Sequence, residues 1–315
     1  MNKEIRKHIQ RRIGWWGLRI STCLTPFVPL RWNYFLGTVI GTLMYYLLAR
    51  HRRNTLISLK IAFPEKRESE RRRLARNSFV FMSQGSLELL YFLKKKCVLD
   101  TVRIEGRQFL DKALALGKGI VALSAHLGNF PLISLKLAQL GYPAHVVARP
   151  MRDEQAGDYV HALRSKSGVG TIFSYPRREC VNNIIRALRN NEIVIIQMDQ
   201  NFGTGGVWVK FFDHLAATPV GPVIFAMRTD SALLPIYIDR EGIGTHCVRI
   251  LPACPLERSS DKDEMILLNT IKFTKLIESW VRNIPAQWSW LHRRWKSQPS
   301  EKMKMMKFKV QKDQT

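Results

Sequence analysis

Residues 119–149 read GIVALSAHLGNFPLISLKLAQLGYPAHVVAR, and this stretch joins two short apolar runs through a segment with helical spacing. The runs at 119–125 and 144–149 have the length and apolar content of buried strands. The segment at 131–141 has a proline in its first turn and ends at Gly141, as helices commonly do. The stretch therefore predicts a strand–helix–strand unit of the kind that builds parallel sheets.

The same alternation continues toward the C-terminus. We expect further strands at 171–175, 193–199, 233–238 and 245–251, and helices at 153–167, 180–190, 219–229 and 262–283. Near 201–212 the glycines 203, 205 and 206 predict a tight turn and a piece of antiparallel sheet. The predicted fold class is α/β, with a mixed, largely parallel sheet flanked by helices.

Residues 1–50 combine basic and apolar sequence. A basic start precedes an apolar stretch at 13–30, and no charged residue occurs from Trp32 to Ala49. That run reaches the lower limit of a transmembrane helix, and the pairs Trp15–Trp16 and Tyr45–Tyr46 suit the headgroup zone. We expect a hydrophobic membrane anchor, as a span, a re-entrant hairpin or an interfacial helix pair. The alternative is a buried core hairpin.

Four segments follow from these patterns. The anchor at 1–50 precedes a helical region at 51–100, an α/β domain at 101–296 and a basic tail at 297–315. The cysteines 23, 97, 180, 247 and 254 are irregularly spaced and include no C-x-x-C pair, which favours a reducing compartment over a disulfide framework or a zinc site. No cleavable signal peptide is evident.

The charge balance restricts the partners. Lys and Arg number 50 against 25 Asp and Glu, which gives a net charge of +25. Such a charge attracts nucleic acid, anionic lipid or an acidic carrier protein. The chain shows no zinc-finger spacing or aromatic RNA-binding motif, and its basic residues cluster beside the apolar N-terminal sequence. We therefore expect no nucleic acid partner.

His126 directly follows the first strand, at the edge where open α/β sheets place their sites. Gly128 would let the backbone pass close to a substrate. The helix that starts near Pro131 offers unpaired N–H groups that can stabilise a developing negative charge, and Asn129 could cap it. A lone histidine in a turn is also commonly a structural hydrogen-bonding residue, so both roles stay open at this point.

Several separated stretches carry a resemblance. They are RRNTLISLKIAFPE (52–65), SAHLGNF (124–130), VVARP (146–150), LRSKSG (163–168), QMDQNFGTGGVWVKFFDHLAATPVGPVIFA (197–226) and PAQWSWLHRRWK (285–296). In this order, over about residues 13 to 296, they resemble the late or secondary lipid A biosynthesis acyltransferases of Gram-negative bacteria. The resemblance also implies a fold like that of glycerolipid and lysophospholipid acyltransferases.

The resemblance implies that a fatty acyl chain passes from acyl-acyl carrier protein or acyl-CoA to a hydroxyl of an anionic, lipid A precursor-like glycolipid. The reaction would occur in the 101–296 domain at the cytoplasmic face of the bacterial inner membrane, without a metal or other cofactor. It would make His126 the base, because a hydroxyl is a poor nucleophile until a base takes its proton. An acidic carrier protein and lipid phosphates both match the charge of +25.

The chain departs from the family pattern at Pro131, where an acid should follow the histidine. One reading is that Asp199, Glu154 or a backbone carbonyl replaces the acid, and Asp199 is the first choice because it ends a buried strand. A second is a divergent acyltransferase for a lysophospholipid or another glycolipid. A third is a catalytically weakened, lipid-binding relative.

The remaining roles are expectations of the same kind. Asn129 would help to place the acceptor or the oxyanion, and Gln200 would be a substrate-binding residue or a sheet-end cap. Arg149 and Arg164 would contact phosphate or the carrier, since a guanidinium binds phosphate bidentately. Packing or a membrane-rim position is expected for Trp288, Trp290 and Trp295, and contact with lipid phosphate for Arg293 and Arg294.

Overall fold

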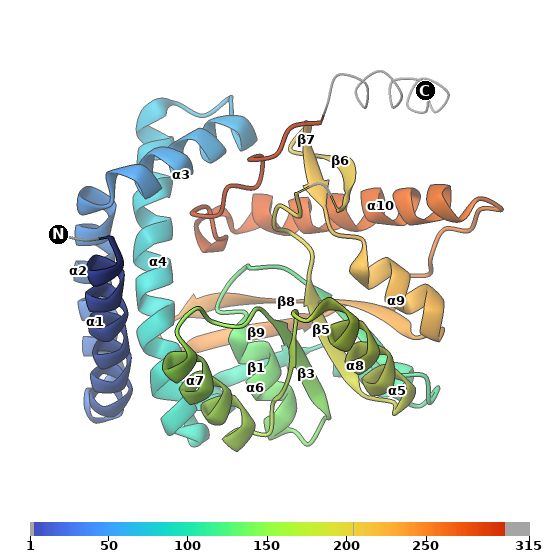
Figure 1. Ribbon diagram of the computed structural model, residues 1–315, viewed down its shortest axis with the longest axis horizontal. Helices are drawn as coiled ribbons and strands as arrows, with labels where there is room; N and C mark the ends of the chain where they lie inside the picture. Colours follow the sequence, from blue (N-terminus) through green and yellow to red (C-terminus); the bar gives the residue numbers. More distant parts are fainter. Residues whose placement is uncertain (1–2, 204, 300–315) are drawn as a thin grey trace.

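A seven-stranded sheet lies at the centre of the protein, which a computed structural model describes over residues 3–203 and 205–299 (Figure 1). The strand order is β1-β9-β8-β2-β5-β3-β4, and all neighbours are parallel except β8 and β9. The strands are β1 (Val102–Glu105), β2 (Ile120–Ser124), β3 (Ala144–Ala148), β4 (Gly170–Phe173), β5 (Ile193–Gln197), β8 (Ala232–Gly242) and β9 (Thr245–Ile250). The predicted mixed, largely parallel α/β sheet is confirmed.

Helices surround this sheet and form a layer of their own on one side of it (Figure 1). The α-helices are α1 (Lys3–Leu24), α2 (Leu30–Leu47), α3 (Ala49–Ala62), α4 (Glu68–Lys94), α5 (Arg107–Leu114), α6 (Pro131–Gln139), α7 (Glu154–Lys166), α8 (Arg177–Arg189), α9 (Gly221–Thr229) and α10 (Lys262–Asn283). Short 3-10 helices are η1 (Thr25–Phe27), η2 (Lys96–Thr101) and η3 (Pro285–Gln287).

Strand β2 is buried along its whole length, and its alternate side chains enter two cores. Val121 and Leu123 join the core that contains α8, α9 and α10. Ile120 and Ala122 join the core that contains α5 and α6. A strand covered by helices on both faces needs an unbroken apolar run, and the sequence IVALS provides one. The polar residues that follow the run therefore lie at the carboxyl end of this central strand.

The N-terminal helices pack as a layer with α4, at the left of Figure 1. Gly37 and Gly41 let α2 approach α4 closely, because a Cβ at Gly41 would lie 2.5 Å from Cα of Val80. No helix within the described residues is long and apolar enough to cross a membrane, so the spanning form of the predicted anchor is unsupported. The outer face nevertheless carries exposed apolar side chains: Ile13, Trp16, Ile20, Leu24, Phe27, Trp32, Phe35, Leu36, Val39 and Leu43.

Two detailed predictions concern the antiparallel hairpin and the basic tail. An antiparallel hairpin does form near the expected place, from β6 (Val207–Phe211) and β7 (His214–Thr218). Its turn is at Phe212 and Asp213, which both have positive φ. Of the glycines expected to allow a tight turn before β6, Gly203 lies in a turn with φ +69°. Of the basic tail predicted at 297–315, only the part up to residue 299 lies within the described residues.

Candidate active site

The sheet brings His126 and Asp199 together from distant parts of the sequence. Strands β2 and β5 are parallel neighbours, with Ser124 opposite Gln197, and each of the two site residues lies two positions beyond its strand. Nδ1 of His126 is 2.8 Å from Oδ1 of Asp199, and the backbone N–H of His126 donates to Oδ2 over 3.0 Å. Asp199 thus places a carboxylate beside the imidazole, which the proline at position 131 cannot provide.

Asp199 is 2 % exposed, and its second oxygen also accepts a hydrogen bond of 2.7 Å from the indole N–H of Trp288. Burial alone would raise the pKa of Asp199, but the charge and hydrogen bonds of His126 and the Trp288 bond outweigh it and hold the pKa below its ordinary value. The carboxylate is therefore ionised and accepts only. This fixes the proton of a neutral imidazole on Nδ1 and leaves Nε2 as a proton acceptor.

The His126 side chain opens into a pocket of about 150 Å³ between α4 and the turn before α6. The pocket is lined by Phe81, Met82, Gly85, Ser86, Leu89, His126, Gly128, Asn129, Phe130, Pro131, Gln287 and Ser289. A more apolar groove of about 260 Å³ shares Met82 and Ser86 with it and reaches Ile40 and Met44 on α2. A histidine in a pocket that adjoins an apolar groove suits chemistry on the end of a long apolar substrate.

The turn around His126 is held by the segment after η3. The N–H of Gly128 donates to the carbonyl of Gln287 over 3.0 Å, and the N–H of Ser289 donates to the carbonyl of His126 over 3.2 Å. Gly128 has φ +62°, and a Cβ there would lie 2.0 Å from the carbonyl oxygen of Ile238. Glycine is thus required at position 128 because the backbone of β8 lies so close to it. The sequence had instead suggested a substrate as the close neighbour.

Asn129 faces the helical layer. Its side-chain nitrogen donates to the carbonyl of Gly85 over 3.1 Å and to Glu88 over 2.8 Å, and the residue is buried. The N-cap residue of α6 is Phe130, without a side-chain capping bond, so the predicted capping by Asn129 is wrong. Asn129 still lines the His126 pocket, while its amide hydrogens hold the turn against α4.

Glu88 is the centre of a buried polar cluster that the sequence did not reveal. It accepts hydrogen bonds from Tyr34, from Nε2 of His246 at 2.9 Å and from Arg240 at 3.0 Å, besides that from Asn129. Burial alone would raise the pKa of Glu88. The His246 hydrogen bond and the Arg240 charge together lower the pKa by more than burial raises it, to about 2. A glutamate inside the apolar run LELLYF was the available signal, since an unpaired buried charge is costly.

The other predicted site residues do not line the pocket. Arg149 is exposed in the loop after β3, and Glu154 is exposed in the first turn of α7. Arg164 is half-buried on α7, and burial lowers the pKa of its guanidinium. Gln200 follows Asp199, and its carbonyl accepts a 3.3 Å bond from Arg294. The structure therefore groups His126, Asp199, Gly128 and Asn129, and leaves Arg149, Arg164, Gln200 and Glu154 apart from the pocket.

The C-terminal motif is mostly structural. Trp288, Trp290 and Trp295 are buried as the packing interpretation expects, and Trp288 also contacts Asp199, which was not predicted. Arg294 is fully buried and donates to the carbonyl of Ala217, so the expected contact of Arg294 with lipid phosphate is wrong. Arg293 is exposed.

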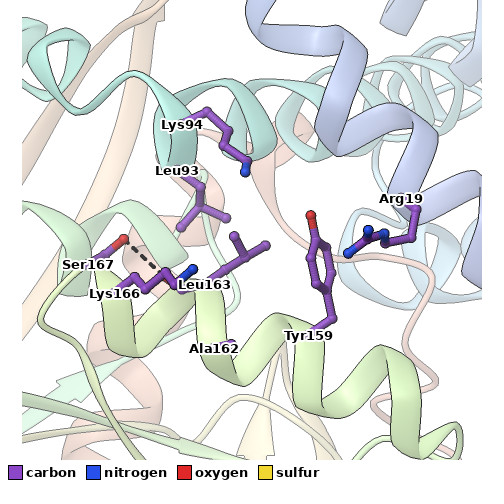
Figure 2. Close-up of a pocket in the computed structure, with 8 residues that line it drawn as sticks. All are labelled: Arg19, Leu93, Lys94, Tyr159, Ala162, Leu163, Lys166 and Ser167. Atoms are coloured by element: carbon purple, nitrogen blue, oxygen red, sulfur yellow. Dashed lines mark hydrogen bonds between the residues drawn. The ribbon is translucent and has the colours of Figure 1, made fainter.

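A larger hollow of about 510 Å³ lies elsewhere, between α1, α4 and α7 (Figure 2). Figure 2 shows Arg19, Tyr159, Lys94 and Lys166 around it, with Leu163 between them. The Arg19 guanidinium lies 4.9 Å from the centre of the Tyr159 ring, which fastens α1 to α7. None of its lining residues is a histidine or a carboxylate, unlike the smaller pocket, which contains His126.

Comparison with known proteins identifies the family of the chain. The model of the family described as bacterial lipid A biosynthesis acyltransferase matches residues 2–297. A lipid A biosynthesis lauroyltransferase of Escherichia coli (strain K12) is 25 % identical over 303 residues, which cover 93 % of this chain and 94 % of that protein. A phosphatidylinositol mannoside acyltransferase of Mycobacterium tuberculosis (strain CDC 1551 / Oshkosh) is 30 % identical over 207 residues, which cover 64 % of this chain and 62 % of that protein.

Proposed function

Because the chain belongs to the bacterial lipid A biosynthesis acyltransferase family, we propose that its His126 pocket moves a fatty acyl chain from a thioester to a hydroxyl of an anionic glycolipid. The observation that carries this proposal is the 2.8 Å contact between the buried Asp199 and His126, which lines a pocket that adjoins an apolar groove. A histidine oriented by a carboxylate is the standard device for activating a hydroxyl.

The proposed reaction has two steps. Nε2 of His126 takes the proton of the acceptor hydroxyl, and the hydroxyl oxygen attacks the thioester carbonyl carbon to form a tetrahedral oxyanion. The intermediate then collapses, the carbon–sulfur bond breaks, and the imidazolium returns its proton to the leaving sulfur. Asp199 stabilises the imidazolium between the steps. The backbone N–H groups of Asn129 and Phe130, just before α6, are the proposed oxyanion donors. Those of Gly128, Leu132 and Ile133 already donate to backbone carbonyls.

The substrates follow from charge and shape. The groove lined by Ile40, Met44, Phe79, Met82 and Leu87 is proposed to take the acyl chain. The donor would be acyl-acyl carrier protein or acyl-CoA, which are both anionic and complement the net charge of +25. The names of the relatives, lipid A and phosphatidylinositol mannoside acyltransferases, favour a glycolipid acceptor.

The proposed location is the cytoplasmic face of the inner membrane. Exposed apolar side chains on α1, η1 and α2, such as Phe27 at 87 % exposure, suit helices that lie in the membrane interface. This form of attachment keeps the basic flanks of both helices on one side of the bilayer.

An assay with the purified chain tests the proposal. Labelled acyl-acyl carrier protein and acyl-CoA would each be offered with a lipid A precursor, a phosphatidylinositol mannoside or a lysophospholipid, and products read by mass spectrometry. We expect an acylated glycolipid. Acylation of the lysophospholipid alone would refute the glycolipid acceptor, and donor binding without product in any combination would refute the catalytic role.

A further inference from the structure

A basic hollow of about 460 Å³ lies between the end of α2, α3 and the first half of α4. It shares no lining residue with the His126 pocket or its apolar groove. Its lining residues are Tyr45, Tyr46, Arg52, Leu56, Arg72, Arg73, Arg76 and Asn77. Four of these carry a guanidinium and none carries a carboxylate, so the hollow concentrates positive charge.

The charge in this hollow is largely uncompensated. Arg72 pairs with Glu68 at 2.6 Å, and both side chains are exposed. Across residues 3–203 and 205–299, no carboxylate forms an ion pair with Arg52, Arg73 or Arg76. Guanidinium groups around one hollow repel each other. A phosphate bound between them would attract each guanidinium and offset this repulsion.

One of these guanidinium groups is already held in position. Nη1 of Arg52 donates to the carbonyls of Tyr45 and Tyr46 over 3.2 and 3.1 Å, and the group lies 5.5 Å from the centre of the Tyr45 ring. Two carbonyls at the end of α2 therefore orient Arg52. A pre-oriented cation loses less conformational entropy when an anion binds.

The surroundings of the hollow identify the source of the anion. Tyr46 is 58 % exposed and the adjoining Leu47 is 77 % exposed, and both belong to the apolar outer face of α2. A ligand that fits must therefore present a phosphate to arginines and apolar chains to a neighbouring surface. A membrane lipid combines these two features, whereas free phosphate supplies only one.

We propose that the arginine hollow (Arg52, Arg72, Arg73 and Arg76) binds the headgroup phosphate of an anionic membrane lipid, whose acyl chains lie against the outer face of α2. This lipid is distinct from the acceptor that reacts at His126. It holds the helical layer on the bilayer, where the acceptor is present, and it makes binding to anionic membranes stronger than binding to neutral ones.

The test is co-sedimentation of the full chain with phosphatidylcholine vesicles that contain or lack phosphatidylglycerol. The paired change Arg73→Gln with Arg76→Gln should weaken binding to the anionic vesicles on the order of thirtyfold. The control pair Arg177→Gln with Arg178→Gln removes the same charge from exposed positions on α8 and should change binding no more than about threefold. Binding to phosphatidylcholine alone should be the same for all three proteins.

Two further measurements separate the alternatives. Equal losses in the two variant pairs, or no loss in either, would overturn the proposal, and so would complete displacement of the chain from anionic vesicles by inorganic phosphate. Acyl transfer to a detergent-solubilised acceptor should be unchanged in the Arg73 and Arg76 pair. Because that assay reports on His126 alone, failure of the lipid site and failure of the proposed activity give different results.

Discussion

At the scale of single residues, the proposed chemistry depends on one buried carboxylate. Asp199 holds His126 through both the imidazole and the backbone N–H. Asp199→Asn should lower kcat on the order of 10² to 10⁴-fold with little change in KM, because an amide neither fixes the tautomer nor stabilises the imidazolium. Steady-state kinetics with a purified acyl donor measures this. Asp213→Asn, at an exposed turn residue, is the control, and full activity of Asp199→Asn would remove Asp199 from the mechanism.

A second change at this scale concerns Gly128. Gly128 and Gly117 both have positive φ, so alanine costs about 1–2 kcal/mol of backbone strain at either position. Only at Gly128 does the added Cβ meet a backbone atom, the carbonyl oxygen of Ile238, whereas Gly117 has nothing within 4 Å. Gly128→Ala should abolish acyl transfer, while Gly117→Ala should keep it despite a similar loss of backbone freedom. Equal activity of the two variants would contradict the reason given for the glycine.

The sequence predicts some of these residues and misses others. His126 and Asp199 both follow strands, and parallel strands end at one edge of a sheet, so their proximity was foreseeable. Trp288 lies far along the chain in an irregular segment, and no local pattern links it to Asp199. Arg149 and Arg164 were expected from guanidinium chemistry and from their place in the stretches that carry the resemblance. Neither determines where a loop or a helix face points.

At the scale of elements, α4 connects the reaction site to the helical layer. Glu88 on α4 joins Tyr34 of α2, Arg240 of β8, His246 of β9 and Asn129 of the active-site turn. Each of these elements is therefore tied to one buried charge. A change at Glu88 should affect stability first and the geometry of the turn as a consequence.

Glu88→Gln should lower the free energy of unfolding by roughly 3 kcal/mol at neutral pH, because it leaves the Arg240 guanidinium buried without its counter-charge and removes the carboxylate that His246 contacts. The pKa of Glu88 is about 2 in the folded protein against an ordinary 4.5. The stabilisation is thus complete above about pH 4.5 and is lost as pH falls toward 2. Urea unfolding at several pH values should show the difference between wild type and variant shrinking over that range.

Glu68→Gln, on the exposed first turn of the same helix, is the control and should leave the urea midpoint unchanged. A pH-independent difference between wild type and Glu88→Gln would contradict the assignment of an ionised Glu88.

Regular elements were the easiest to predict. Apolar strands and amphipathic helices of the α/β unit are local patterns, and β2, α6 and β3 lie where residues 119–149 place them. The turn of the β6–β7 hairpin was not predictable in this way. Its residues Phe212 and Asp213 have positive φ although neither is a glycine, because packing of the hairpin on α10 overrides local preference.

At the scale of the whole molecule, the apolar outer face of α1, η1 and α2 should determine membrane binding. Phe27→Asp with Phe35→Asp removes two exposed aromatic side chains from it and should weaken binding to neutral phosphatidylcholine vesicles about tenfold or more. Leu116→Asp with Tyr175→Asp changes two exposed residues in the loops that follow α5 and β4 and should have little effect. Vesicle flotation measures both, and equal losses would contradict a specific membrane face.

The role of the N-terminal segment could not be read from hydropathy alone. An uncharged run from Trp32 to Ala49 fits a short span as well as a surface helix. The difference lies in long-range packing, since Gly37 and Gly41 allow α2 to lie against the backbone of α4. The order of the strands in the sheet depends on such distant contacts too.

The most direct test of the account is acyl transfer by a His126→Ala variant. The purified variant should remain folded and vesicle-bound, yet its transfer of a labelled acyl chain to the glycolipid should fall to the level of a reaction without enzyme. His214→Ala, which removes an exposed histidine on β7, should keep wild-type activity. Turnover by His126→Ala near that of the wild type would contradict the central claim that His126 is the base.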